Sequence, residues 1–357
     1  MRRITVKHAQ PGMVAELPVY DNWGNLLLNK DQQFDAKLIS QMTDKGVTEL
    51  LIRDPRMADV VIAPLFTPQT EGVLAKAFKW LVMDCSSKMI LSDGHLSRVK
   101  AAMDDMVKEI AKSYKGDVNV SCSISRKDYA YLQPVKTAGL ALAIGSALKL
   151  PPNELFTLGM AAILKDVCLP IEIIDSVDCL IEGGSPKLRD HPRNAYHMLS
   201  LHRLTAGAIA TAVSQHHEKW SGTGYPKMLK GADICRHARI IAIADAFVDL
   251  LSDRPGRGKF MSHEAIEYIM AGGGDQFDPD LVKVFVQHIP SYPAGLSVQL
   301  NSGETGIVSN PKLGFVARPI VRICSKPAEG NLANPFDVDL SKVEFQRMLI
   351  TKILEYN

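Results

Sequence analysis

Apolar and polar positions alternate near the N-terminus of this chain, in short runs separated by turn residues. This pattern predicts strands at about Ile4–Val6, Leu17–Tyr20, Leu26–Leu28 and Leu50–Ile52. A helix from about Asp35 to Lys45, closed by Gly46, should pack on these strands. Residues 1–65 are therefore predicted to form a small α+β domain.

From about Pro68 the apolar positions recur at helical spacing instead. Leu74, Phe78, Leu81 and Val82 follow one another at i, i+4, i+7 and i+8, so residues 66–125 are predicted to be linking helices. Residues 126–290 keep the helical period between proline and glycine interruptions, which indicates an all-α domain. The fold class is therefore mainly α, a helical bundle with a small α+β N-terminal domain.

After Pro293 the alternation of apolar and polar positions returns. It predicts strands at about Leu296–Leu300, Gly306–Val308 and Ile320–Ile323, and we expect a last helix from about Leu340 to Leu354. Residues 291–357 are thus predicted to be a short β C-terminal appendage with a helix. A length of 357 residues agrees with two or three such domains.

Composition and charge exclude several classes of protein. With 46% hydrophobic and 22% charged residues, the chain is neither disordered nor fibrous. A net charge of +2 provides no field to hold duplex DNA, so DNA is not an expected partner. No apolar run reaches the ~20 residues of a membrane span, and the N-terminus lacks the apolar core of a signal peptide. The six cysteines form no CxxC pair, and we expect a cytoplasmic protein with no membrane partner.

Two adjacent histidines, His216 and His217, stand where a predicted helix ends. His216 shares a helix face with Leu204, Ala208 and Ala212, so it should point toward the core. His217 is rotated from it by about 100°, and both imidazoles could reach one metal ion only at a helix end. The following Ser221–Gly224 segment supplies that end. By itself, the pair fits ordinary helix-end histidines equally well.

Two aspartates lie on apolar helix faces, where an ionised carboxylate needs a partner. Asp166 continues the stripe that contains Leu158 and Ile163, and Asp245 aligns with Ile241 and Val248. Burying such a charge costs several kcal/mol without a cation or several hydrogen bonds. A hydrogen bond between helices would satisfy either aspartate alone. Together with His191 and the histidine pair, however, they make five potential ligands that suit Fe, Mn, Zn or Ni in a helical bundle.

The order of these residues resembles the HD-GYP family. The segments that carry the resemblance are LKD at Leu164–Asp166, HP at His191–Pro192, HHE with GTGYP at His216–Pro226, IIAIAD at Ile240–Asp245 and DRP at Asp253–Pro255. They cover about residues 125–290. The resemblance implies an HD-superfamily helical core and a bacterial signalling protein, because the family's members are metal-dependent phosphodiesterases that hydrolyse cyclic di-GMP. The N-terminal stretch also looks, more loosely, like a domain often placed before such modules.

The resemblance also assigns site residues, and two of the family's metal ligands are replaced. The positions that match the family's metal ligands are Asp166, His191, His216, His217 and Asp245. Gln133 stands in place of the family's first histidine, and Lys165 in place of the histidine of the His-Asp pair. In addition, Leu169 replaces a lysine that contacts the substrate phosphate, and Ser221 replaces the aspartate that begins the family's GYP motif.

These replacements predict a degenerate active site. An ammonium has no acceptor and repels a metal cation, so one of the two metal positions should be lost. Asp166, His191, His216 and His217 should still hold one divalent transition metal. We expect Lys165 to pair with Asp245 or Asp166; the alternative is that its ammonium extends to solvent. The catalytic candidates are thus Asp166, Asp245 and Lys165.

Four further residues are candidates for binding a dinucleotide. Arg254 and Arg257 match the family's basic pair and suit bidentate phosphate contact, although they also fit a solvated loop. Tyr225 and Trp220 could stack on guanine, or Trp220 could instead cap the helix bundle. We expect a regulatory module of cyclic di-GMP signalling with weak or no hydrolysis, acting through a partner signalling protein. The alternative is a phosphodiesterase that works with one ion, with Asp245 as orienting group or base.

Overall fold

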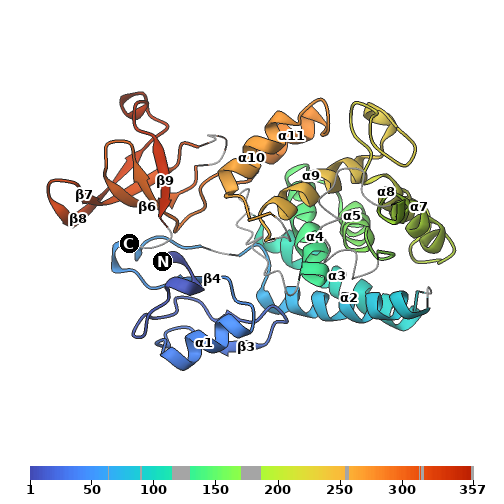
Figure 1. Ribbon diagram of the computed structural model, residues 1–357, viewed down its shortest axis with the longest axis horizontal. Coiled ribbons are helices and arrows are strands. Elements are labelled where there is room, and N and C mark those ends of the chain that lie inside the picture. Colours follow the sequence, from blue (N-terminus) through green and yellow to red (C-terminus); the bar gives the residue numbers. More distant parts are fainter. Residues whose placement is uncertain are drawn as a thin grey trace. The chain divides into compact units, whose positions relative to one another are not determined.

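The structure is a computed structural model, and it describes residues 1–62, 64–88, 91–114, 129–169, 186–253, 257–312, 314 and 317–354, with the side chains of residues 86–88 and 186–188 excepted. Its contacts divide the chain into two units (Figure 1). Among the described residues, the β unit combines the segment up to Pro64 with the segment from Val286 onward. The helical unit comprises the residues from Leu65 to Phe285.

The N-terminal part of the β unit contains two antiparallel strand pairs and one helix. Strand β1 (Arg2–Thr5) pairs with β4 (Glu49–Ile52), and β2 (Val19–Tyr20) pairs with β3 (Leu26–Leu28). Helix α1 (Ala36–Asp44) begins where the Asp35 carboxylate accepts a hydrogen bond from the backbone N–H of Leu38. The apolar side chains of both strand pairs and of α1 share one core, so the predicted α+β character is confirmed.

The C-terminal part is a five-stranded antiparallel sheet in the order β8-β7-β6-β5-β9. Its strands are β5 (Ser297–Leu300), β6 (Thr305–Asn310), β7 (Ile320–Lys326), β8 (Gly330–Asp339) and β9 (Ile350–Leu354). The expected last helix from Leu340 to Leu354 is wrong. Only a single 3-10 turn forms there, and β9 pairs with β5 instead, which places Ile350 and Ile353 against the core of the sheet.

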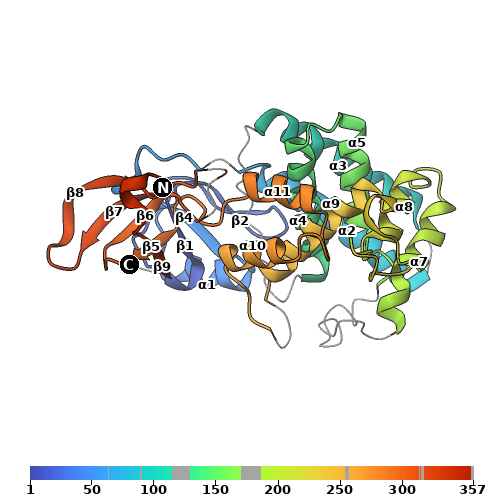
Figure 2. The same ribbon diagram turned by 90° about the horizontal axis from the view of Figure 1, so that it is seen from above.

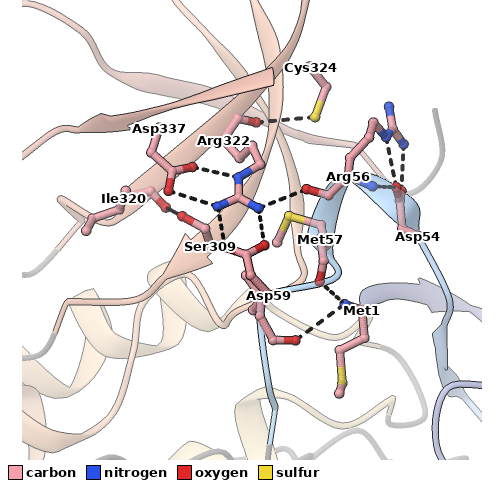
Figure 3. Close-up of polar contacts among 11 residues, drawn as sticks. Met1, Asp54, Arg56, Met57, Asp59, Ser309, Ile320, Arg322, Cys324 and Asp337 are labelled. Carbon is pink, nitrogen blue, oxygen red and sulfur yellow. Dashed lines mark hydrogen bonds and ion pairs between the residues drawn. The ribbon is translucent and has the colours of Figure 1, made fainter. Parts of the chain in front are cut away.

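Arg322 on β7 joins the two parts of the β unit (Figure 3). Its guanidinium donates hydrogen bonds to the carboxylates of Asp59 (2.8 Å) and Asp337 (2.8 Å), and to the backbone carbonyl of Arg56 (2.9 Å). Met57 packs against apolar side chains of the sheet beside this network. Segments more than 260 residues apart in the sequence are thus held in one unit.

The helical unit is a bundle whose elements are α2 (Pro68–Lys88), α3 (Asp93–Ser113), α4 (Tyr129–Ala147), α5 (Pro152–Leu164), α7 (Pro186–Ser200), α8 (Ala208–Gln215), α9 (Arg236–Leu250), α10 (Ser262–Ala271) and α11 (Pro279–His288), the last ending just beyond the unit's boundary. Helix α4 packs against α2, α3, α5 and α9 (Figure 2). Almost all of its side chains are buried. Small residues permit this packing: a Cβ on Gly139 would lie 2.6 Å from the ring of Phe66. The mainly α fold class is confirmed, and none of the described helices is both long and apolar enough to cross a membrane.

Candidate metal centre

Four predicted ligands converge in the helical unit from three different helices. Asp166 lies just beyond the last residue of α5, and His191 is within α7. His216 and His217 directly follow the last residue of α8. One ligand atom from each of the four side chains lies within 4.8 Å of the others. The structure therefore brings together four of the five residues that match the family's ligands, three of them just beyond helix ends.

The local structure of α8 explains how His216 reaches this centre. The helix begins at Ala208, so Leu204 precedes it and is 41% exposed; the expected apolar face that included Leu204 is wrong in that part. The face starts at Ala208 and continues through the buried Ala212 to His216, which is 2% exposed. The Nδ1 of His216 lies 2.6 Å from the carbonyl oxygen of Val213. When Nδ1–H donates to that carbonyl, the lone pair of Nε2 is left for a metal ion.

The separations between the ligand atoms fit a shared ion. The Nε2 atoms of His191 and His216 are 3.2 Å apart, and they lie 3.2 and 3.6 Å from Oδ1 of Asp166. Ligands bonded to one ion at ~2.1 Å are about 3.0 Å apart at a right angle and about 3.4 Å apart at the tetrahedral angle. The chemistry of the donor set, three imidazoles and one carboxylate, also suits a divalent transition metal. These residues therefore fit one ion.

Lys165 occupies the space between two carboxylates. Its side chain is 2% exposed, its Nζ lies 2.9 Å from Oδ1 of Asp245, and it also contacts Oδ2 of Asp166. Gln133 donates a hydrogen bond to the same oxygen of Asp245. Burial lowers the pKa of Lys165, but the two carboxylates outweigh burial and raise it above the usual value of 10.5. The predicted pairing of Lys165 is confirmed, and the alternative that it extends to solvent is wrong.

The charges of the centre fix the protonation of its other members. Burial alone would raise the pKa of Asp166, but Lys165, His191 and His216 hold it well below the usual value, so the carboxylate stays ionised. Burial, together with the neighbouring His216 and His191, holds the pKa of His217 well below 6.5. His217 is therefore neutral, the form in which an imidazole binds a metal ion.

Tyr225 lies against the ring of His217. The two rings stack with their centroids 4.7 Å apart and an angle of 17° between their planes. The guanidinium carbon of Arg189, which belongs to α7, lies 5.6 Å from the centroid of the Tyr225 ring. Burial raises the pKa of Tyr225 above its usual value of 10, so the phenol is neutral. Arg189 was not among the predicted site residues, although it stands two positions before His191.

The loop that carries Tyr225 is held by a buried carboxylate and by a glycine. Glu218 is 3% exposed and accepts hydrogen bonds from the backbone N–H groups of Lys227 (2.7 Å) and Leu229 (3.0 Å). A Cβ on Gly224 would lie 2.2–2.5 Å from three backbone atoms of residues 217–219, so no larger residue fits there. Glu218 was also missed; its only signal in the sequence is its place directly after the histidine pair.

The remaining predicted ligand-binding residues have other neighbours. The guanidinium of Arg239 lies 5.6 Å from the centroid of the Trp220 ring. Arg257 donates to the carbonyl oxygen (2.7 Å) and to the carboxylate (3.2 Å) of Asp249. Arg254 lies outside the described residues. Stacking of Trp220 and phosphate contact by Arg257 stay predictions.

Comparisons with known proteins show which proteins this chain is similar to. A family model described as "HD domain" matches residues 96–281. A cyclic di-GMP phosphodiesterase of Pseudomonas aeruginosa is 32% identical over 230 residues, which is 62% of this chain and 55% of the relative. The cyclic di-GMP phosphodiesterase response regulator RpfG of Xanthomonas campestris is 33% identical over 150 residues, or 40% of this chain and 39% of the relative. PdeB of Borreliella burgdorferi, also named a cyclic di-GMP phosphodiesterase, is 26% identical over 197 residues, or 53% of this chain and 52% of the relative. The chain thus matches about half the length of these relatives or less.

Proposed function

Because this chain belongs to the HD domain family, as a protein of the HD-GYP type, we propose that it acts in cyclic di-GMP signalling as a binding or regulatory module with weak or no hydrolysis. A module that binds a messenger without consuming it must pass the signal on by contact. A partner signalling protein is therefore part of the proposal.

The position of Lys165 carries the proposal. A binuclear phosphodiesterase uses two ions to hold the phosphate and to lower the pKa of the attacking water. Here a buried ammonium contacts both Asp166 and Asp245, two residues that match the family's metal ligands. Gln133 offers a neutral amide in place of an imidazole, and its N–H group already donates to Asp245. Lys165 thus neutralises charge that a second ion would otherwise meet, and its own charge repels that ion.

One divalent ion of Fe, Mn, Zn or Ni is proposed at Asp166, His191, His216 and His217. Such an ion would polarise a phosphoryl oxygen and lower the pKa of a bound water. The protein's own residues limit what can follow. Asp245 is the candidate base, but its Oδ1 is shared between Gln133 and Lys165, which weakens it as a proton acceptor. Hydrolysis should therefore be slow.

The second candidate function is an active phosphodiesterase with a reduced metal site. It is favoured by the four-ligand cluster and by relatives that are named cyclic di-GMP phosphodiesterases. In that case one ion would activate water, and Asp245 would orient it. The two functions differ in the rate at which purified protein consumes cyclic di-GMP and in the metal that it retains.

The test measures cyclic di-GMP binding, turnover and metal content on the same purified chain. We expect binding, turnover well below the roughly 1 s⁻¹ of ordinary enzymes, and no more than one metal equivalent per chain. His216→Ala should remove that equivalent. Exchanging Gln133→His together with Lys165→His should raise metal content toward two equivalents. Turnover at about 1 s⁻¹ or faster in the unaltered chain, or two equivalents of metal in it, would overturn the regulatory proposal.

A further inference from the structure

A face of the helical unit beside the metal centre combines positive charge with aromatic rings. We call it the basic-aromatic face, and it consists of Arg189, Arg193, Tyr196, Tyr225 and Lys227. The first three lie on α7 at i, i+4 and i+7, so they share one side of the helix. The Nζ of Lys227 lies 5.9 Å from the ring centroid of Tyr196. In the same way, the guanidinium carbon of Arg189 lies 5.6 Å from the ring centroid of Tyr225.

The three cations of this face have no acidic partner among the described residues. In the part of the chain that the structure describes, neither Arg189, Arg193 nor Lys227 has a carboxylate within ion-pair distance, and all three are exposed. The one acidic residue of α7 is Asp190, which is rotated from Arg189 by about 100° around the helix axis. Three unpaired cations beside two tyrosines form a surface that attracts an anion with an aromatic part.

This face connects to the metal centre through one continuous stack. His217, a candidate ligand, stacks on Tyr225, and Tyr225 in turn carries the guanidinium of Arg189. The ring of Tyr225 therefore separates the guanidinium of Arg189 from His217. A cyclic dinucleotide has two phosphodiester groups, so one can lie at the centre while the other reaches Arg189. The family's phosphate-contacting lysine is replaced by the buried Leu169 in this chain. A bound phosphate would therefore need a cation from another position.

We propose that Arg189 is a ligand-contacting residue of this protein, which binds a phosphodiester oxygen of a guanine dinucleotide next to the metal centre. The guanidinium suits this role because its planar fork can bind two oxygens of one phosphate. Lys227 adds charge on the same side. This inference rests on the proposed function, since it names residues that hold the same dinucleotide.

The experiment titrates cyclic di-GMP by calorimetry into the metal-loaded chain of 357 residues, for the unaltered protein and for Arg189→Ala and Arg189→Lys. Charge-assisted hydrogen bonds contribute enough that Arg189→Ala should weaken binding by about 10- to 100-fold. Arg189→Lys keeps the charge but loses the fork, so its affinity should fall between the two. The matched control is Arg98→Ala, which removes an exposed arginine of α3 and should bind as the unaltered chain does.

The outcomes distinguish a failure of the proposed function from a failure of the proposed Arg189 contact. If the unaltered chain does not bind cyclic di-GMP, the proposed function fails. If it binds and Arg189→Ala binds equally well, or loses no more affinity than Arg98→Ala, the role of Arg189 is overturned while the proposed function stands. Metal content and melting temperature are measured on every variant. A loss of affinity in Arg189→Ala that comes with a loss of metal would show that Arg189 supports the centre, and would also overturn the contact with the ligand.

Discussion

Replacing Lys165 by methionine removes a buried cation while nearly preserving the length of the side chain. The Nζ of Lys165 lies 2.9 Å from Asp245 and contacts Asp166, whose side chain is 15% exposed, against 20% for Asp245. At an effective dielectric constant of ~20, a unit charge pair at this distance interacts by roughly 6 kcal/mol, part of which offsets desolvation. Removing one partner of a buried pair typically costs ~3–5 kcal/mol. Because both carboxylates are partly exposed, we expect about 3 kcal/mol.

The assay is thermal unfolding in a chelator, followed by the same measurement with added Mn²⁺ or Zn²⁺. For a unit of about 200 residues, a loss of ~3 kcal/mol lowers the melting temperature by roughly 6–12 °C. A divalent ion should then stabilise Lys165→Met more than it stabilises the unaltered chain, because the ion can take the place of the ammonium between Asp166 and Asp245.

A matched control distinguishes this effect from the loss of any buried lysine. Lys136 on α4 is 9% exposed, and its Nζ lies 2.5 Å from Oε1 of Glu71 on α2. Lys136→Met should also lower the melting temperature, but added metal should stabilise it no more than the unaltered chain. Lys165 does not compensate the two carboxylates if Lys165→Met melts like the unaltered chain in chelator, or if metal raises the melting temperature of all three proteins equally.

Two further predictions concern the loop of the metal centre and the β unit. Gly224→Ala should destabilise the helical unit by about 1–3 kcal/mol, because its Cβ would lie 2.2 Å from the backbone nitrogen of Lys219. Gly94→Ala is the control and should not destabilise the unit, because its Cβ would meet no atom closer than 4.0 Å. Equal melting temperatures of the two variants would contradict the steric explanation for Gly224. Arg322, through its hydrogen bond, lowers the pKa of Asp59 from 3.8 to about 2, so this pair stabilises the β unit above about pH 4 and ceases to do so as the pH falls toward 2. Arg322→Leu should return that pKa toward 3.8, as NMR titration of the carboxyl carbon would show; an unchanged pKa would exclude Arg322 as its cause.

The local sequence pattern was sufficient to predict an element whose backbone hydrogen bonds form within the element itself or with a segment near it in the sequence. The helix expected from Asp35 to Lys45 forms over Ala36–Asp44, because its cap and its apolar stripe are both written in adjacent residues. The segment Leu340–Leu354 was misassigned for the opposite reason. Its β9 strand obtains hydrogen bonds from β5, about fifty residues earlier, and no local signal distinguishes such a strand from a short amphipathic helix.

The residue types of the metal centre were determined by the sequence, because a buried carboxylate or a histidine pair at a helix end requires a partner wherever the chain places it. Which partners meet was decided by the tertiary structure. Only the packing of α5 against α9 brings Lys165 to Asp245, and only the loop after α8 places Tyr225 between His217 and Arg189. Electrostatic and stacking energies depend on distances of a few ångströms between residues remote in sequence. Periodicity fixes which face of an element a residue occupies, whereas packing fixes what lies opposite it.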